Sequence, residues 1–289
     1  MDSVGIKLAR SEICRDRLVF QDETGINKAL SDGFFLVKIP AKIDVAPGIK
    51  LSQNFFKESD SGPDSVYKGF KEIDSIYFDR EHFQTEHILA DRVARENYFP
   101  GEVNSLADQM NDVAITILKN ILDYIKLPKE HWSLVTGGCV DNNGTHWFAC
   151  SHYRSEIDKQ GCATHQDTGF VTILYIDQPG LEAKIGSKWI KIDPTPGYFV
   201  VNFGRSFEIL TEKMNTQVKS ILHRVSKTHK INGVSDRISM ASFTNLPNHL
   251  NLYQYHQNSP EIYQSVQDFL TEFNKTTWDD KHTDFGLTS

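Results

Sequence analysis

Residues 164–180 read THQDTGFVTILYIDQPG and combine a His-x-Asp pair, a β-branched and aromatic run, and a turn signal. The run at 170–176 is typical of a buried strand, and Gln178-Pro179-Gly180 ends it. Similar short runs, separated by Asn-Gly and Pro-Gly turns, lie at 147–153, 189–192, 198–203, 219–225 and 237–243. Many short strands at regular spacing with such turns predict an all-β barrel or jelly roll.

The first half of the chain has a different hydrophobic period. Between residues 104 and 124, apolar side chains recur three and four positions apart, which predicts one long amphipathic helix with a buried face. The run GFFLVKIP at 33–40 is typical of a buried strand. We therefore predict a mainly β fold with flanking helices, in which a helix-rich N-terminal region (1–131) and a β domain (132–289) form one structural unit.

The His-x-Asp pair supplies two ligands of the kind that bind a metal. His165 and Asp167 are two residues apart, so on an extended chain both side chains point to the same face. His223 lies in the apolar run SILHRV at 220–225, where a solvated imidazole would be out of place. Two imidazoles and one carboxylate leave the opposite face of the ion open, which suits non-haem Fe(II). A structural zinc site would close that position with another Cys or His.

The His-x-Asp spacing alone is a weak signal, because His282-Thr283-Asp284 repeats it at the end of the chain. No later His follows that second pair, and we interpret it as a solvated tail. Each ligand also has a plain alternative: His165 as a surface His, and His223 as a buried His bonded to backbone. The conjunction of all three with the strand pattern favours the metal site.

Fourteen positions after His223, Arg237 and Ser239 again share one strand face. An Arg fork beside a hydroxyl is well matched to a carboxylate. An unpaired Arg would be costly to bury in a barrel. The partner is therefore either an Asp or Glu of the same chain or, behind a metal site, a dicarboxylic acid that serves as cosubstrate.

Composition excludes several classes of protein. The net charge is -7 and no Lys/Arg cluster is present, so no nucleic-acid partner is expected. No secretory signal and no apolar run of membrane-spanning length occur, so we expect a cytoplasmic protein without a membrane partner. The few cysteines form no CxxC pair and are expected to be free thiols: Cys14, Cys139, Cys150 and Cys162.

Taken in order, these stretches resemble the Fe(II)- and 2-oxoglutarate-dependent oxygenases of the isopenicillin N synthase-like family. The resemblance spans nearly the whole chain and implies a double-stranded β-helix (jelly-roll) core with flanking helices. It is carried by GFFLV (33–37), NFF (54–56), HQD (165–167), GLE (180–182), KWI (188–190), PGYFVVNFG (196–204), KSILHRV (219–225) and RISMASF (237–243).

The resemblance also implies roles for individual residues. His165, Asp167 and His223 would bind iron(II), and Arg237 with Ser239 would hold the distal carboxylate of 2-oxoglutarate. Iron(II) is the expected cofactor, and 2-oxoglutarate and O2 are the expected cosubstrates. The implied reaction is hydroxylation, desaturation or oxidative cyclisation of a small metabolite, with release of succinate and CO2.

Two departures from the family pattern bear on the ligands. Many relatives have Asn-Tyr-Tyr-Pro where this chain has SHYR (151–154), and Tyr153 keeps a hydroxyl that can contact 2-oxoglutarate. Relatives often have Gly-Asp where this chain has Gly-Arg, which introduces Arg205. Arg154 and Arg205 are thus candidate anchors for an acidic or amino-acid-derived substrate, unless each pairs with a local carboxylate. Phe243 is a further candidate substrate contact.

Two other functions stay open at this point. The same family includes Fe(II) oxidases that need no 2-oxoglutarate, and some of those also keep the Arg and Ser. A non-catalytic member of the fold that binds a small ligand is the third alternative, although such a module needs no open iron site. The sequence predicts neither the identity of the substrate nor the oligomeric state.

Overall fold

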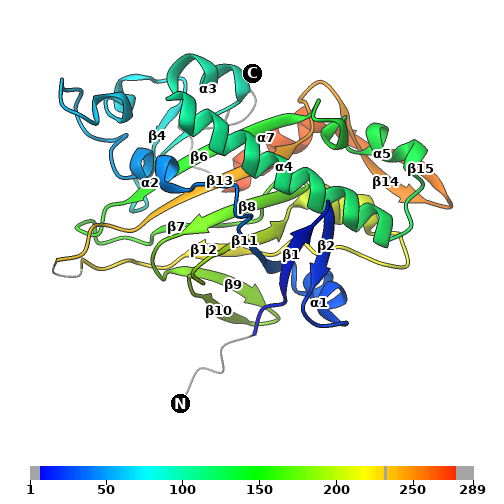
Figure 1. Cartoon of the computed structure of the whole chain (residues 1–289). Helices are drawn as coiled ribbons and strands as arrows, with labels where there is room; N and C mark the ends of the chain where they lie inside the picture. Colours follow the sequence, from blue (N-terminus) through cyan, green and yellow to red (C-terminus); the bar gives the residue numbers. More distant parts are fainter. Residues whose placement is uncertain (1–6, 231–232, 278–289) are drawn as a thin grey trace.

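A computed structural model describes residues 7–230 and 233–277 of the chain. Its main element is a nine-stranded sheet (Figure 1). In spatial order the strands are β2 (Arg17–Phe20), β1 (Arg10–Cys14), β3 (Phe34–Lys38), β11 (Tyr198–Phe203), β8 (Val171–Ile176), β13 (Ile238–Asn245), β6 (Thr145–Tyr153), β5 (Thr85–Ala90) and β4 (Tyr77–Asp79).

A second, four-stranded sheet faces the central strands of the first. Its order is β10 (Lys188–Ile192), β9 (Leu181–Ile185), β12 (His223–Val225) and β7 (Cys162–His165). A separate hairpin consists of β14 (Asn251–His256) and β15 (Ser259–Ser265). From β6 to β13 the strands alternate between the two sheets, except at the β9–β10 hairpin, and this arrangement confirms the predicted jelly roll.

Seven α-helices surround the sheets within the described residues, together with three short 3-10 turns. The helices are α1 (Gly25–Asp32), α2 (Ala46–Ser52), α3 (Arg92–Tyr98), α4 (Gly101–Tyr124), α5 (Lys129–Val135), α6 (Arg205–Thr211) and α7 (Val266–Thr277). The 3-10 turns are η1 (Ser65–Tyr67), η2 (Phe70–Glu72) and η3 (Cys139–Asp141). None of these helices is both long enough and apolar enough to span a membrane.

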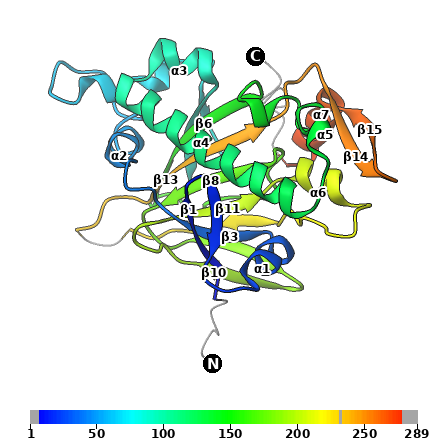
Figure 2. The same cartoon turned by 45° about the vertical axis from the view of Figure 1, so that its right-hand side comes forward.

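The predicted long helix is α4, which lies across the outer face of the nine-stranded sheet (Figures 1 and 2). It starts after Pro100, whose ring is compatible with a helix N-terminus. Its apolar stripe is fully buried against β8 and β13 and includes Leu106, Met110, Ala114, Ile117 and Ile121. The central strands are covered by α4 on the outer face of the sheet and line the cavity on the inner face. This explains why they are apolar on both faces.

The N-terminal region contributes strands as well as helices. Strands β1, β2 and β3 extend one edge of the main sheet beside β11, whereas β5 and β4 extend the other edge beside β6. Of these five, only β3 was predicted. Gly33 joins α1 to β3 with a φ of 81°, and its N–H donates to the Ala29 carbonyl.

The strand predicted at 219–225 is shorter than expected. Only His223–Val225 joins the second sheet, where His223 lies opposite both His165 and Ala183. The preceding residues are tied elsewhere, since the Lys219 N–H donates to the Leu30 carbonyl at 3.0 Å. This short strand is enough to place His223 at the mouth of the space between the two sheets.

Candidate metal centre

The three predicted metal ligands converge between the two sheets. His165 ends β7, Asp167 lies in the turn before β8, and His223 begins β12 directly opposite His165. Asp167 Oδ1 lies 3.6 Å from Nε2 of each imidazole, and the ring centroids are 4.3 Å apart. One atom from each residue lies within 4.8 Å of the others, so the three can bind one ion together.

Backbone carbonyls orient both imidazoles. His165 Nδ1 lies 3.0 Å from the Ala163 carbonyl oxygen, and His223 Nδ1 lies 3.1 Å from the Ile221 carbonyl oxygen. A carbonyl only accepts hydrogen bonds, so Nδ1 is the protonated nitrogen in each ring. The Nε2 lone pairs therefore point toward the shared centre, as in metal sites whose ligands are fixed by outer contacts.

The two carboxylate oxygens of Asp167 have different surroundings. Its Oδ2 accepts hydrogen bonds from Thr172 Oγ1 and Asn202 Nδ2, each at 2.6 Å. The Asp167 carbonyl accepts the N–H of Arg205 at 2.7 Å, at the start of α6. These contacts hold the side chain in one orientation and leave Oδ1 directed at the imidazoles.

The site favours the protonation states that bind a metal. Burial, and then the neighbouring His223, lower the pKa of His165 to about 4, so its imidazole is neutral at physiological pH. Burial alone would raise the pKa of Asp167, but the two imidazoles and the hydrogen bonds to Oδ2 outweigh it and lower the pKa. A neutral imidazole beside a carboxylate is the donor set that a divalent cation requires.

A cavity of about 190 Å³ opens from the three ligands. Arg237 lines it, is 2% exposed, and places its Cζ 4.3 Å from the centroid of the Tyr153 ring. Its Nε donates to the Gln178 carbonyl at 3.3 Å, whereas its buried Nη1 has no hydrogen-bond partner. Ser239 Oγ lies 3.3 Å from the Tyr153 hydroxyl. The structure thus brings the predicted cosubstrate residues together on one wall.

The alternative partner for Arg237, an Asp or Glu of the same chain in a salt bridge, is not found within the described part of the chain. Its Nη1 donor is buried beside an open cavity that also holds the metal ligands. A buried donor without a partner costs free energy, unless a ligand supplies the acceptor. The geometry therefore favours an anionic ligand over an intraprotein partner.

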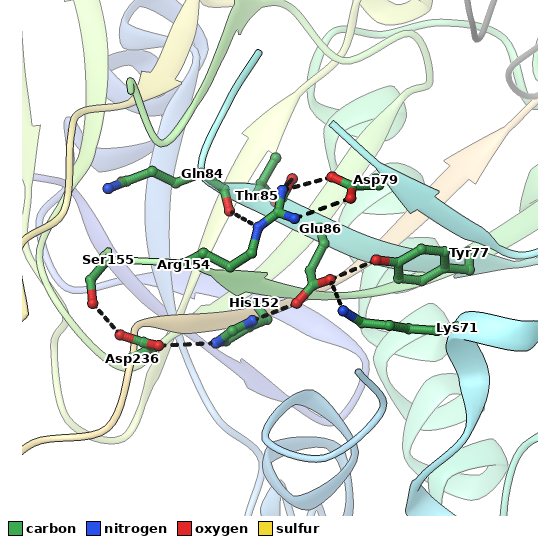
Figure 3. A network of polar contacts seen from close by, with 10 residues as sticks. All are labelled: Lys71, Tyr77, Asp79, Gln84, Thr85, Glu86, His152, Arg154, Ser155 and Asp236. Atoms are coloured by element: carbon green, nitrogen blue, oxygen red, sulfur yellow. Dashed lines mark hydrogen bonds and ion pairs between the residues drawn. The ribbon is translucent and has the colours of Figure 1, made fainter. Parts of the chain in front are cut away.

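The two Arg residues predicted to anchor a substrate lie outside this cavity. Arg154 makes a two-pronged ion pair with Asp79, at 3.1 Å and 2.7 Å (Figure 3). Arg205 is more exposed and pairs with Glu208 one turn along α6. Neither lines the cavity, whereas Phe243 does. The partner of Arg154 lies 75 residues away, on β4, so sequence reasoning could not identify it.

Sequence reasoning also missed the outer part of the cavity. The C-terminal helix α7 lines it with Val266, Phe269, Leu270 and Phe273, which follow the i, i+3, i+4, i+7 spacing of an amphipathic helix. That spacing was available as a signal for the helix, although not for its position over the cavity. The second His-x-Asp pair, at 282–284, lies outside the described residues.

Comparisons with known proteins agree with this geometry. Residues 144–246 match the family model of the 2OG-Fe(II) oxygenase superfamily. The matched segment contains the three candidate metal ligands, Arg237 and Ser239.

Among curated proteins, 2'-deoxymugineic-acid 2'-dioxygenase of Hordeum vulgare is 30% identical over 49% of this chain and 39% of its own length. The 2-oxoglutarate-dependent dioxygenase iboH of Amanita muscaria is 33% identical over 36% of this chain and 52% of its own. The chain thus spans about half or less of the length of these relatives.

Solved structures cover more of the chain. A protein of Neurospora crassa, solved at full length in complex with alpha-KG and 5-formyluracil, matches with a TM-score of 0.67 over 95% of this chain and 98% of that one. The sequence identity is 19%, so this similarity establishes the fold alone.

Proposed function

We propose that this protein is an Fe(II)- and 2-oxoglutarate-dependent oxygenase acting on a small molecule. The observation that carries the proposal is the buried Nη1 of Arg237, which lacks a partner and lines the same cavity as the three metal ligands. A metal site alone would also suit an oxidase that needs no 2-oxoglutarate. A buried guanidinium beside it supports a carboxylate-bearing cosubstrate.

The residues present fit both groups. His165, Asp167 and His223 would hold iron(II), and Arg237 with Ser239 would hold the distal carboxylate of 2-oxoglutarate. When bound, this pair supplies the oxidising chemistry, in which 2-oxoglutarate loses CO2 and becomes succinate as O2 is reduced.

The protein itself supplies orientation and exclusion of water. Thr172 and Asn202 keep Asp167 in its ligating orientation through its Oδ2. The Tyr153 ring lies against the Arg237 guanidinium and limits its rotamers. These contacts fix the residues that would bind the metal and 2-oxoglutarate before either arrives. A fixed site of this kind allows a substrate C–H bond to be placed within reach of the oxidant.

The cavity is better matched to an uncharged, largely apolar substrate than to the acidic substrate that the sequence suggested. Among the described residues lining the cavity, the only Lys or Arg side chains are Arg224 and Arg237. Arg224 is paired with Glu182 at 2.8 Å and lies 4.1 Å from the Trp189 ring centroid. The rest of the outer wall is mostly apolar: Leu89, Trp147, Phe243, Leu246, Val266, Phe269, Leu270 and Phe273.

The test is succinate formation by the purified protein with Fe(II), O2 and 2-oxoglutarate, across pairs of small molecules that differ only in charge. Each pair consists of a neutral alcohol or amide and the corresponding carboxylic acid. We expect succinate formation to require all three components and to be stimulated by members of the neutral series. Product formation without any 2-oxo acid would establish the oxidase alternative, and stimulation by the acids alone would overturn the proposed substrate class.

A further inference from the structure

Behind the cavity wall that contains Tyr153, Arg237 and Ser239 lies a buried carboxylate that the proposed chemistry does not use. Glu86, on β5, is 1% exposed. Its Oε1 lies 2.9 Å from His152 Nδ1, and its Oε2 accepts from the Tyr77 hydroxyl at 2.6 Å and from Lys71 Nζ at 2.9 Å (Figure 3). A charge buried this deeply is tolerated only when donors surround it, as they do here.

His152 extends this contact to a second carboxylate. Its Nε2 lies 3.3 Å from Asp236 Oδ2 (Figure 3). Carboxylate oxygens only accept hydrogen bonds, so each ring nitrogen of His152 faces an acceptor. The ring of Phe56 stacks on the imidazole with a centroid distance of 3.7 Å and an interplanar angle of 10°. The side chain of His152 is therefore held on three sides.

Two members of this chain of contacts are sequence neighbours of the residues expected to bind 2-oxoglutarate. His152 precedes Tyr153 and Asp236 precedes Arg237. Adjacent residues on a strand point to opposite faces, so His152 lies behind the sheet while Tyr153 faces the cavity. The Tyr153 N–H donates to the Arg237 carbonyl at 3.0 Å, which joins the two pairs through the backbone.

Asp236 connects this network to the backbone that carries Arg237. It lies in the loop that enters β13, two residues before the strand begins, and its side chain is 23% exposed. Its Oδ1 also accepts from the Ser155 hydroxyl. The backbone that carries Arg237 therefore reaches the buried Glu86 through one imidazole.

We propose that Glu86, His152 and Asp236 are positioning residues that hold Arg237 and Tyr153 in the geometry needed to bind the distal carboxylate of 2-oxoglutarate. The inference rests on the proposed function, because it assigns a role toward that cosubstrate. The same strands offer a matched control, since the Arg154–Asp79 ion pair is also buried in part but lies outside this chain of contacts (Figure 3).

The experiment is calorimetric titration of 2-oxoglutarate into the full chain loaded with Mn(II), which takes the same ligands without turnover. Asp236→Ala should bind 2-oxoglutarate about tenfold more weakly, as for other residues that act through a ligating neighbour. Its Mn(II) affinity should be unchanged. Asp236→Asn should retain wild-type affinity, because its amide oxygen can still accept from His152 while its amide N–H donates to the Ser155 hydroxyl oxygen. The control Asp79→Asn should also bind normally.

A second variant, His152→Phe, keeps the ring stacked on Phe56 and removes both contacts to carboxylates. It should show the same loss of 2-oxoglutarate affinity, so the inference does not depend on one variant. Wild-type affinity in folded Asp236→Ala, or a parallel loss of Mn(II) affinity, would overturn the positioning role. If the wild-type protein itself binds no 2-oxoglutarate, the proposed function fails and this inference fails with it.

Discussion

Arg237 is the residue at which the proposed cosubstrate can be tested most sharply. Replacing it with methionine removes the guanidinium and leaves an unbranched side chain that can fill most of the space. The wild-type side chain is 2% exposed, and its Nη1 has no partner. We therefore expect Arg237→Met to lose affinity for 2-oxoglutarate with little loss of fold stability. The substitution gives up the Nε hydrogen bond to the Gln178 carbonyl, but it also removes a buried charge whose Nη1 lacks an acceptor.

The size of the effect follows from the contact that is lost. A hydrogen bond to a charged group contributes about 1.5–3 kcal/mol. Since about 1.4 kcal/mol corresponds to a tenfold change in affinity, the KM for 2-oxoglutarate should rise by roughly 10- to 140-fold. Arg237→Lys keeps the charge but not the planar fork, so its KM should lie between those of Arg237→Met and the wild type.

The assay is succinate formation as a function of 2-oxoglutarate concentration, with thermal unfolding measured on the same preparations. Arg205→Met serves as the control, because it makes the same substitution at an Arg outside the cavity. An unchanged KM in Arg237→Met would refute the assignment of this residue. An equal rise in KM for Arg205→Met would show that the effect is not specific to the site.

Two further predictions concern the polar residues that support the site. Asn202→Leu removes the donor to Asp167 Oδ2 and should weaken Fe(II) binding by about 10- to 100-fold in an anaerobic titration; unchanged affinity would contradict the account. Burial raises the pKa of Glu86, but hydrogen bonds from His152, Tyr77 and Lys71 lower it from 4.5 to about 2. A depressed pKa stabilises the fold above the unfolded-state value, and this contribution, about 3 kcal/mol, is lost as the pH falls from 4.5 toward 2. The stability of Glu86→Gln, measured by denaturant unfolding at each pH, should depend less on pH in that window, and an unchanged dependence would argue against the charged network.

The ligand set was predictable because it depends on local rules. His165 and Asp167 are two residues apart, which puts both side chains on one face of an extended chain, and His223 stood out as a polar residue in an apolar run. The central strands and the long helix α4 were predictable for the same reason, since their hydrophobic periods are strong. In each case the information lay within a window of a few residues.

Two hairpins were missed because their turns lack the usual signal. The β1–β2 turn places Arg15 and Asp16 at φ values of 48° and 63°, and the β14–β15 turn places Gln257 and Asn258 at 49° and 61°. Tight hairpin turns with positive φ normally contain glycine, as in Asn-Gly or Asp-Gly, and neither turn does. Without a glycine in the turn, the sequence does not predict that the flanking segments pair as strands.

The roles of the two additional Arg residues depended on tertiary contacts. Nothing near Arg154 in the sequence indicates Asp79, which reaches it only because β4 and β5 extend the sheet beside β6. The apolar outer cavity was likewise hidden, since α7 reaches it from the end of the chain. Both cases depend on contacts between segments that lie far apart in the sequence.

Anaerobic Fe(II) titration tests most directly whether His165, Asp167 and His223 together bind one iron(II) ion. We predict one ion per chain for the wild type, and loss of binding in His165→Ala, Asp167→Ala and His223→Ala with the fold retained by circular dichroism. His282→Ala should bind as the wild type does. Wild-type Fe(II) affinity in any of the three ligand variants, or loss of the ion in His282→Ala, would contradict the account.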